Sequence, residues 1–289
     1  IRANHERLLR EHRHIRFMWV PYTDTVVVVT NDPVPPELIR DPNRTLGGSL
    51  SAQRERLHSN HDMTKLPSVP LVNGATARKV TNLEATEPMR ALLAATVPPT
   101  EGEGFGDDPS SSSSSSSAPS AAGADAYRDM GFAELRDKLL AVAPLDVDWI
   151  KKVNAAEAEF WIRSESFRIS RNVDLLQFDC GGEQWVSEVV FPAGSLERPT
   201  GSDLLFMEEV LGLIEAENIP APAPIEQRWS SDSASLMSPS HATPAQQARM
   251  LAPATLSDTF HSWVGIIMYL PSEDPNVRRA ITENFLAYK

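Results

Sequence analysis

Residues 263–270 read WVGIIMYL and form the longest apolar run of the chain. A run of this length is typical of a β-strand and falls far short of the ~20 residues that a membrane-spanning helix needs. Beyond it, Asp274 precedes Pro275, an order that commonly begins a helix because Asp caps the N-terminus and Pro fits the first helical position. The apolar residues that follow at helical spacing are Val277, Ile281 and Phe285. The sequence therefore predicts a strand followed by a helix at this end of the chain.

Five other segments have the pattern of strands. In residues 15–20 large apolar side chains alternate with others, and a turn at 21–24 leads into 25–30, which holds four consecutive valines. Such a run predicts a strand that is buried on both faces. The shorter candidates lie at 175–178, 184–191 and 226–229.

Apolar residues at helical spacing predict four further helices. Their predicted inner faces are, in chain order, Met89, Leu92 and Leu93; Phe132, Leu135, Leu139 and Val142; Trp149, Val153, Ala156 and Phe160; and Phe206, Val210, Leu213 and Ile214. We expect Pro144 to stop the second of these helices and Ser202 or Asp203 to cap the fourth. Because strands and helices follow each other without regular alternation, the sequence favours an α+β fold with a mainly antiparallel sheet flanked by helices.

A long stretch of low complexity interrupts these elements. Residues 102–123 include eight consecutive serines at 110–117. Such a stretch buries too little apolar surface to offset the entropy lost on ordering. We therefore predict the first strands of one domain at 1–32, a flexible insert at 33–129 and the main body of the domain at 130–289.

Composition restricts the classes of function. The 289 residues carry a net charge of −12, which argues against nucleic acid as a partner because phosphates need a basic surface. The single cysteine, Cys180, excludes an internal disulfide and a cysteine zinc cage. The chain opens on Ile1 and not on methionine, so we expect a piece of a longer protein, from which a targeting segment could be missing.

The strongest candidate for chemistry is the segment 224–229, Pro-Ile-Glu-Gln-Arg-Trp. Residues two apart on a strand face the same way, so Glu226 and Arg228 would form one polar pair. A carboxylate that accepts and a guanidinium that donates hydrogen bonds hold a hydroxylated substrate from two sides. A structural salt bridge is the alternative. The same spacing occurs at 11–13, which we interpret as a solvated helix or strand edge, and at 134–136, which we interpret as a surface charge pattern on a helix.

Two weaker candidates concern cysteine and histidine. Cys180 precedes two glycines, which permit close approach of the backbone. It is either a small buried side chain or a thiol beside a ligand site. His12 and His14 have the spacing of two metal ligands on one strand face, but no third ligand stands nearby in the sequence, so we predict no metal site.

Five segments together resemble the plant and algal L-galactono-1,4-lactone dehydrogenases, a family of flavoenzymes. They are 14–30 (HIRFMWVPYTDTVVVVT), 153–160 (VNAAEAEF), 178–192 (FDCGGEQWVSEVVFP), 219–229 (IPAPAPIEQRW) and 262–271 (SWVGIIMYLP). Unusual strings of this length in the expected order make the resemblance specific. It covers most of the chain except about 33–129.

The resemblance implies the aldonolactone-oxidase (cap) domain of a flavoprotein of the vanillyl-alcohol-oxidase type. FAD would be bound mainly by a domain upstream of Ile1. The catalytic pair that binds the aldono-1,4-lactone would be Glu226 and Arg228, with Cys180 near the substrate. The implied reaction, the last step of ascorbate synthesis, moves a hydride from the lactone C2–H to the flavin while the C2 hydroxyl loses its proton, and cytochrome c accepts the electrons.

The resemblance also implies a mitochondrial location, on the intermembrane-space side of the inner membrane. Two alternatives stay open on the sequence. The chain could be a non-catalytic partner in the assembly of respiratory complex I, or part of an oxidase that passes electrons to oxygen. The intact residues Glu226 and Arg228 favour an enzyme over an assembly partner.

Overall fold

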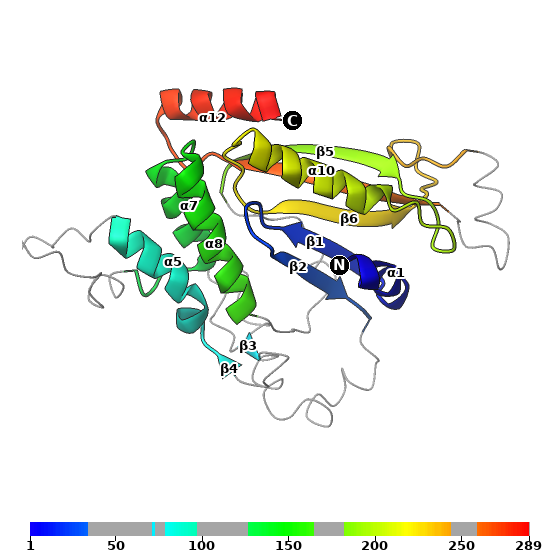
Figure 1. Ribbon diagram of the computed structural model, residues 1–289, viewed down its shortest axis with the longest axis horizontal. Coiled ribbons are helices and arrows are strands. Elements are labelled where there is room, and N and C mark those ends of the chain that lie inside the picture. Colours follow the sequence, from blue (N-terminus) through cyan, green and yellow to red (C-terminus); the bar gives the residue numbers. More distant parts are fainter. Residues whose placement is uncertain (34–70, 73–78, 97–126, 165–181, 244–258, 289) are drawn as a thin grey trace, which may run out of the picture.

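The computed structural model of the protein describes residues 1–33, 71–72, 79–96, 127–164, 182–243 and 259–288. Its centre is a five-stranded antiparallel sheet with the strand order β2-β1-β6-β7-β5 (Figure 1). The strands of this sheet are β1 (His14–Trp19), β2 (Val26–Asn31), β5 (Gln184–Pro192), β6 (Ile225–Ser231) and β7 (Phe260–Tyr269). A separate two-stranded pair consists of β3 (Leu71–Val72) and β4 (Lys79–Val80).

Helices flank the sheet and gather in groups (Figure 1). In the described residues they are α1 (Arg2–Glu11), α5 (Asn82–Thr96), α7 (Phe132–Val142), α8 (Val147–Arg163), α10 (Ser202–Ala216) and α12 (Pro275–Tyr288). The helices α5, α7 and α8 form a bundle at one end of the sheet, and α10 lies along the sheet. The predicted α+β class with an antiparallel sheet is therefore confirmed.

The predicted elements that fall within the described residues are all present, whereas the predicted strand at 175–178 lies outside them. The helix α12 begins at Pro275, and Asp274 Oδ1 accepts a hydrogen bond from the N–H of Asn276 at 2.8 Å. The helix α1 was not predicted from the sequence. Its inner side consists of Leu8 and Leu9 with a buried His5, which is too little apolar surface for a clear helical pattern.

The two faces of the sheet are covered by different helices. One face packs against α1, α10 and α12 through side chains such as Phe17, Val264 and Met268. The other face packs at one end against the bundle, through Ile267 and Tyr269 of β7. The rest of this second face carries the charged residues of the candidate site.

Two predictions about burial are wrong. The valine run forms β2, an edge strand that pairs with β1 alone, and Val28 is 36% exposed. Branched side chains suit any half-buried pleated surface, so a valine run does not by itself require burial on both faces. Arg136, predicted on the surface, is buried. Its Nη1 donates to the Tyr269 hydroxyl at 2.9 Å, and its guanidinium lies 3.9 Å from the centroid of that ring, a cation–π contact.

The bundle includes a helix from within the range 33–129. Most of that range lies outside the described residues, so a flexible insert there remains a prediction. The helix α5 within it buries Met89 and Leu93 against α7 and α8. The core of the domain therefore extends to a segment that sequence reasoning placed in the insert.

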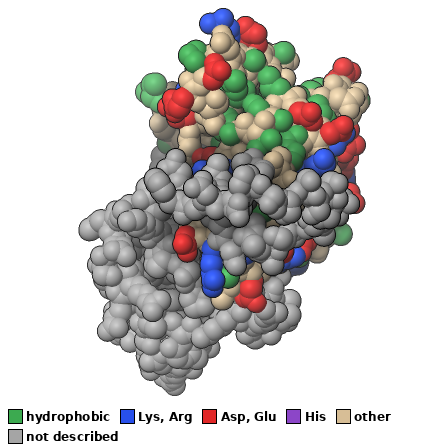
Figure 2. Space-filling view, turned by 90° about the vertical axis from the view of Figure 1, so that its left-hand side faces the viewer, with side chains coloured by type: hydrophobic (Ala, Val, Ile, Leu, Met, Phe, Trp, Pro, Cys, Tyr) green, Lys and Arg blue, Asp and Glu red, His purple; other side chains and the backbone are tan. Residues whose placement is uncertain are grey.

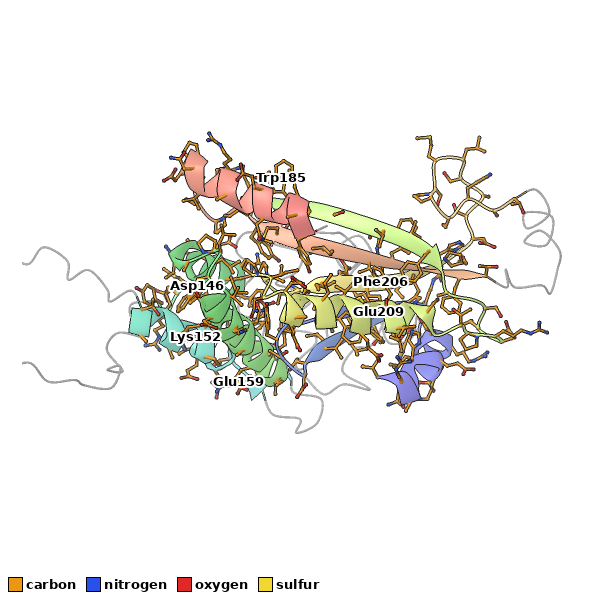
Figure 3. All side chains as sticks on the ribbon, turned by 45° about the horizontal axis from the view of Figure 1, so that its top comes forward. Asp146, Lys152, Glu159, Trp185, Phe206 and Glu209 are labelled. Carbon is orange, nitrogen blue, oxygen red and sulfur yellow. The ribbon has the colours of Figure 1, made fainter. Side chains whose placement is uncertain are left out.

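Asp146 caps the N-terminus of α8, where its Oδ1 accepts the N–H of Trp149 at 2.8 Å (Figure 3).

One buried side chain of α8 ties the bundle to the chain that enters β6. Asn154 is fully buried, and its Nδ2 donates to the carbonyl oxygens of Pro21 and Ala221, both at 3.0 Å. Its Oδ1 accepts the backbone N–H of Ala223 at 3.0 Å. Asn154 thus joins the β1–β2 turn to the segment that leads directly into β6, and it positions the start of that strand.

The surface at the bundle end mixes side chains of several kinds. Viewed from this end, the described part of the molecule shows hydrophobic side chains among acidic and basic ones (Figure 2).

In the part of the chain that the structure describes, no helix combines the length and the apolar character needed to cross a membrane.

Candidate functional site

Glu226 and Arg228 lie on the same face of β6, as the alternation of the strand predicts. The opposite face of β6 is directed towards α1 and α10. There Ile225 is buried in the core beside α10, and Trp229 packs edge-on against Phe17 with ring centroids 4.8 Å apart. The prediction that these side chains divide between two faces is confirmed.

A buried hydrogen-bond network fixes which face of β6 carries the charges. Gln227 is fully buried, and its Nε2 donates to the carbonyl oxygen of Asp203 at 3.0 Å and to Ser262 Oγ at 3.1 Å. Its Oε1 accepts the indole N–H of Trp19 at 3.1 Å. A slip of one residue in the pairing would place the charged side chains in the core and leave these polar groups without partners. The network therefore holds the register of β6.

The pairing of the strands places further side chains beside the two residues. Directly paired residues project from the same face of a sheet. Glu226 pairs with Met18 on β1 and with Gly265 on β7, and Gly265 pairs in turn with Glu188 on β5. This first row across the sheet therefore holds two carboxylates with a glycine between them.

The neighbouring row on the same face holds two arginines and a tryptophan. Arg228 pairs with Arg16 on β1 and with Trp263 on β7, and Trp263 pairs with Val190 on β5. Like charges directly opposite each other are destabilising, so the two arginines need nearby carboxylates. The first row supplies one carboxylate for each of them.

Glu226 and Arg228 each form an ion pair with a different partner. Arg16 Nη1 lies 3.5 Å from Glu226 Oε1. Arg228 reaches across β7 to Glu188: Nη2 donates to Oε1 at 2.8 Å and to Oε2 at 3.1 Å, and Nε donates to Oε1 at 3.2 Å. The two residues share one face of β6, as predicted, but the ion pairs that they form are with residues of other strands and not with each other. Residues two apart on a strand are separated by about 6.5 Å along it, and oppositely charged partners on other strands lie within reach.

The four charged groups differ in their access to solvent. The side chain of Glu226 is 11% exposed, whereas that of Arg228 is 51% exposed. The guanidinium of Arg228 lies 5.2 Å from the centroid of the Trp263 ring, and the indole N–H of Trp263 donates to Ser230 Oγ at 2.8 Å. Arg228 Nη1 has no hydrogen-bond partner among the described residues. The recessed carboxylate of Glu226, an acceptor, thus lies near the accessible guanidinium of Arg228, a donor. The carboxylate of Glu188 and the indole of Trp263 hold that guanidinium.

The other predicted candidates do not join this site. Cys180 lies outside the described residues, so its proximity to the substrate stays a prediction. His12 Nδ1 contacts Asp32 Oδ2 at 2.6 Å. The backbone N–H of Arg13 and the His12 side chain hold the pKa of Asp32 below its usual value. Among the described residues, no group of three or more His, Cys, Asp or Glu side chains is placed to hold a metal ion.

An ionisable side chain outside the charged face of β6, that of Glu157, is buried in the helical bundle. Burial raises the pKa of Glu157 on α8 to about 7, although the nearby Arg136 and a hydrogen bond from the Trp161 indole N–H at 3.2 Å act in the opposite direction. A pKa near neutrality suits a general base. Glu157 is only 2% exposed and lies among the helices, so we assign it to the interior of the bundle and not to the site.

Sequence reasoning missed Arg16, Glu188 and Trp263. Arg16 occupies a polar position in an alternating strand, and Glu188 is the one charged residue in the strand segment 184–191. These signals mark side chains that point away from a core. They do not show that the side chains lie next to Glu226 and Arg228, because this depends on the order of the strands.

Comparison with known proteins agrees with the resemblance seen in the five segments. All 289 residues align with L-galactono-1,4-lactone dehydrogenase 2, mitochondrial, of Oryza sativa subsp. japonica, at 38% identity. The chain is homologous, over its whole length, to part of the L-galactono-1,4-lactone dehydrogenases. The mitochondrial L-galactono-1,4-lactone dehydrogenase of Arabidopsis thaliana is 39% identical over the same 289 residues. The chain spans 39% of the length of the rice dehydrogenase and 38% of that of the Arabidopsis dehydrogenase. No family model matches the chain.

Proposed function

We propose that the chain is the substrate-binding part of a mitochondrial, FAD-dependent L-galactono-1,4-lactone dehydrogenase. The enzyme would oxidise the lactone to ascorbate and pass the electrons to cytochrome c. The observation that carries the proposal is the charged face of β6, where Glu226 and Arg228 lie side by side, each held by an oppositely charged partner. The homology of the whole chain to dehydrogenases of this name supports the choice of substrate.

Arg228 is the group that meets the lactone oxygens in this proposal. Its Nη1 has no partner among the described residues, and its side chain is the most exposed of the four charged ones. A guanidinium stabilises negative charge that develops on oxygen when a hydroxyl proton is lost. The ion pair with Glu188 and the indole of Trp263 hold the guanidinium in place before the substrate arrives, which lowers the cost of binding.

Glu226 orients the sugar in this proposal. Its carboxylate is nearly buried and lies 3.5 Å from Arg16 Nη1. A carboxylate accepts hydrogen bonds and therefore suits a hydroxyl group. Glu226 therefore accepts a hydrogen bond from a lactone hydroxyl and fixes the position of the ring relative to Arg228. We assign no residue as the base that removes the C2 hydroxyl proton.

The N-terminus of α10 is unsuited to the pyrophosphate of FAD. The helix α10 begins after Gly201, which has the left-handed conformation, but the first turn holds the buried carboxylate of Asp203. A negative charge at a helix N-terminus opposes phosphate binding there. We propose that the described residues bind and orient the lactone, and that FAD is held mainly by another domain of the protein, as the family resemblance implies.

The remaining parts of the proposal concern partner and location. The net charge of −12 suits a basic electron acceptor such as cytochrome c. The relatives carry the word mitochondrial in their names, and we propose the same compartment for this protein, on the intermembrane-space side of the inner membrane.

The test is lactone-dependent reduction of cytochrome c by the full-length protein, with flavin content measured by absorbance. Arg228→Ala is compared with wild type, and Arg279→Ala serves as the control because Arg279 is exposed on α12. We expect Arg228→Ala to retain flavin and to lose about 100-fold or more in rate, with Arg279→Ala unchanged. No lactone oxidation by flavin-loaded wild type would refute the proposed function. Unchanged kinetics in Arg228→Ala would refute the site.

A further inference from the structure

Gly265 occupies the centre of the charged face. It lies on β7 between Glu226 on β6 and Glu188 on β5, in direct register with both. The next residues of β7 on the same face, Trp263 and Ile267, carry large side chains. The absence of a side chain at Gly265 therefore leaves a gap in a row of larger residues, beside both carboxylates.

The backbone does not explain why this position is glycine. Gly182 and Gly194 have positive φ angles, and a Cβ at either would lie within 3.0 Å of another atom of the protein. Gly265 has neither property: its φ is not positive, and no described atom lies within 4 Å of the place where its Cβ would be. Glycine inside a strand is less stable than alanine, and it often marks the close approach of a ligand.

The surroundings of the gap indicate the chemistry of the ligand. Glu226 and Glu188 offer carboxylate acceptors on two sides, which suit hydroxyl groups. Arg228 offers a donor, and Trp263 offers an aromatic surface against which C–H groups pack. Gly265 is itself buried. A small, flat and polyhydroxylated ring combines all the groups that this arrangement would bind.

We propose that Gly265 determines the specificity of the site, because the ring of the aldonolactone lies directly over it between Glu226 and Glu188. This inference rests on the proposed function and adds the position of the ring. A methyl group at residue 265 would occupy the space of the ring without displacing any described protein atom. The effect of a substitution should therefore fall on lactone binding and leave the fold intact.

The experiment compares Gly265→Ala and Gly265→Val with wild type in the full-length, flavin-loaded protein. Gly212→Ala is the matched control, because a Cβ at Gly212 on the exposed side of α10 also meets no described atom within 4 Å. The measurements are KM and kcat for L-galactono-1,4-lactone, the melting temperature without lactone, and the shift of that temperature caused by lactone.

We expect KM to rise about tenfold or more in Gly265→Ala and further in Gly265→Val, with the lactone-induced shift lost in parallel. The melting temperature without lactone should stay the same or rise in Gly265→Ala, and Gly212→Ala should keep the wild-type KM. A folded Gly265→Ala protein with the wild-type KM and the wild-type lactone-induced shift in melting temperature would overturn the inference about Gly265. In that case the activity of the wild-type protein would still uphold the proposed function. A flavin-loaded wild type that neither oxidises nor binds the lactone would overturn both.

Discussion

Replacement of Asn154 by alanine tests how the bundle positions β6. The change removes three hydrogen bonds of 3.0 Å, to the carbonyl oxygens of Pro21 and Ala221 and from the N–H of Ala223. All three backbone groups face a fully buried side chain. A buried polar group that loses its partner costs about 1–3 kcal/mol, so the local stability should fall by at least about 3 kcal/mol. That loss corresponds to roughly 100-fold more frequent opening.

The assay is hydrogen–deuterium exchange of the full-length protein, followed in the peptide that contains 225–231. This peptide should exchange about 100-fold faster in Asn154→Ala, and KM for the lactone should rise because Glu226 and Arg228 lose their fixed positions. Lys152→Ala is the control, since Lys152 is exposed on the same helix (Figure 3) and surface changes usually fall within about 0.5 kcal/mol. An exchange rate of 225–231 that stays within threefold of wild type would show that Asn154 does not hold β6.

Two further predictions concern buried or partly buried carboxylates. Glu188→Gln keeps the size of the side chain but removes the charge that holds Arg228. We expect kcat/KM for the lactone to fall roughly tenfold, a modest loss because the ion pair is partly exposed. An unchanged kcat/KM would show that Arg228 does not need Glu188 as a partner. For Glu157, whose pKa burial raises to about 7, the folded state binds the proton more tightly than the unfolded state, so stability is lost as the pH rises from about 4.5 through 7. Glu157→Gln should therefore be more stable than wild type by up to about 3 kcal/mol at pH 8 and by little near pH 4.5. The measurement is thermal unfolding of both proteins across this pH range. Parallel pH profiles of the two proteins would show that the pKa of Glu157 is not raised by burial.

Much of the fold could be predicted because its elements have strong local patterns. The helical spacing of Leu135, Leu139, Val153 and Phe160 identified the bundle helices, and all four side chains are buried. The alternation of residues along β6 placed Glu226 and Arg228 on one face, since the period of a strand is two. Local pattern therefore identified both the elements and the first two residues of the candidate site.

The neighbours of these residues could not be predicted from local pattern. Glu188 and Arg16 meet the pair only because β6 lies between β1 and β7, with β5 beyond β7. These strands come from distant parts of the sequence, and their order is set by the packing of the whole sheet. Arg136 was misjudged for a related reason: its partner Tyr269 lies 133 residues further along the chain. Contacts between distant segments decide both cases.

The most direct test of the central claim is a crystal structure of the full-length, flavin-loaded protein with L-galactono-1,4-lactone bound. We predict that the lactone lies on the charged face of β6, with an oxygen that accepts a hydrogen bond from Arg228, a hydroxyl that donates to Glu226, and the ring over Gly265. A lactone bound elsewhere, with the Arg228–Glu188 and Arg16–Glu226 ion pairs unchanged and no contact to Glu226 or Arg228, would contradict the claim that this face binds the substrate.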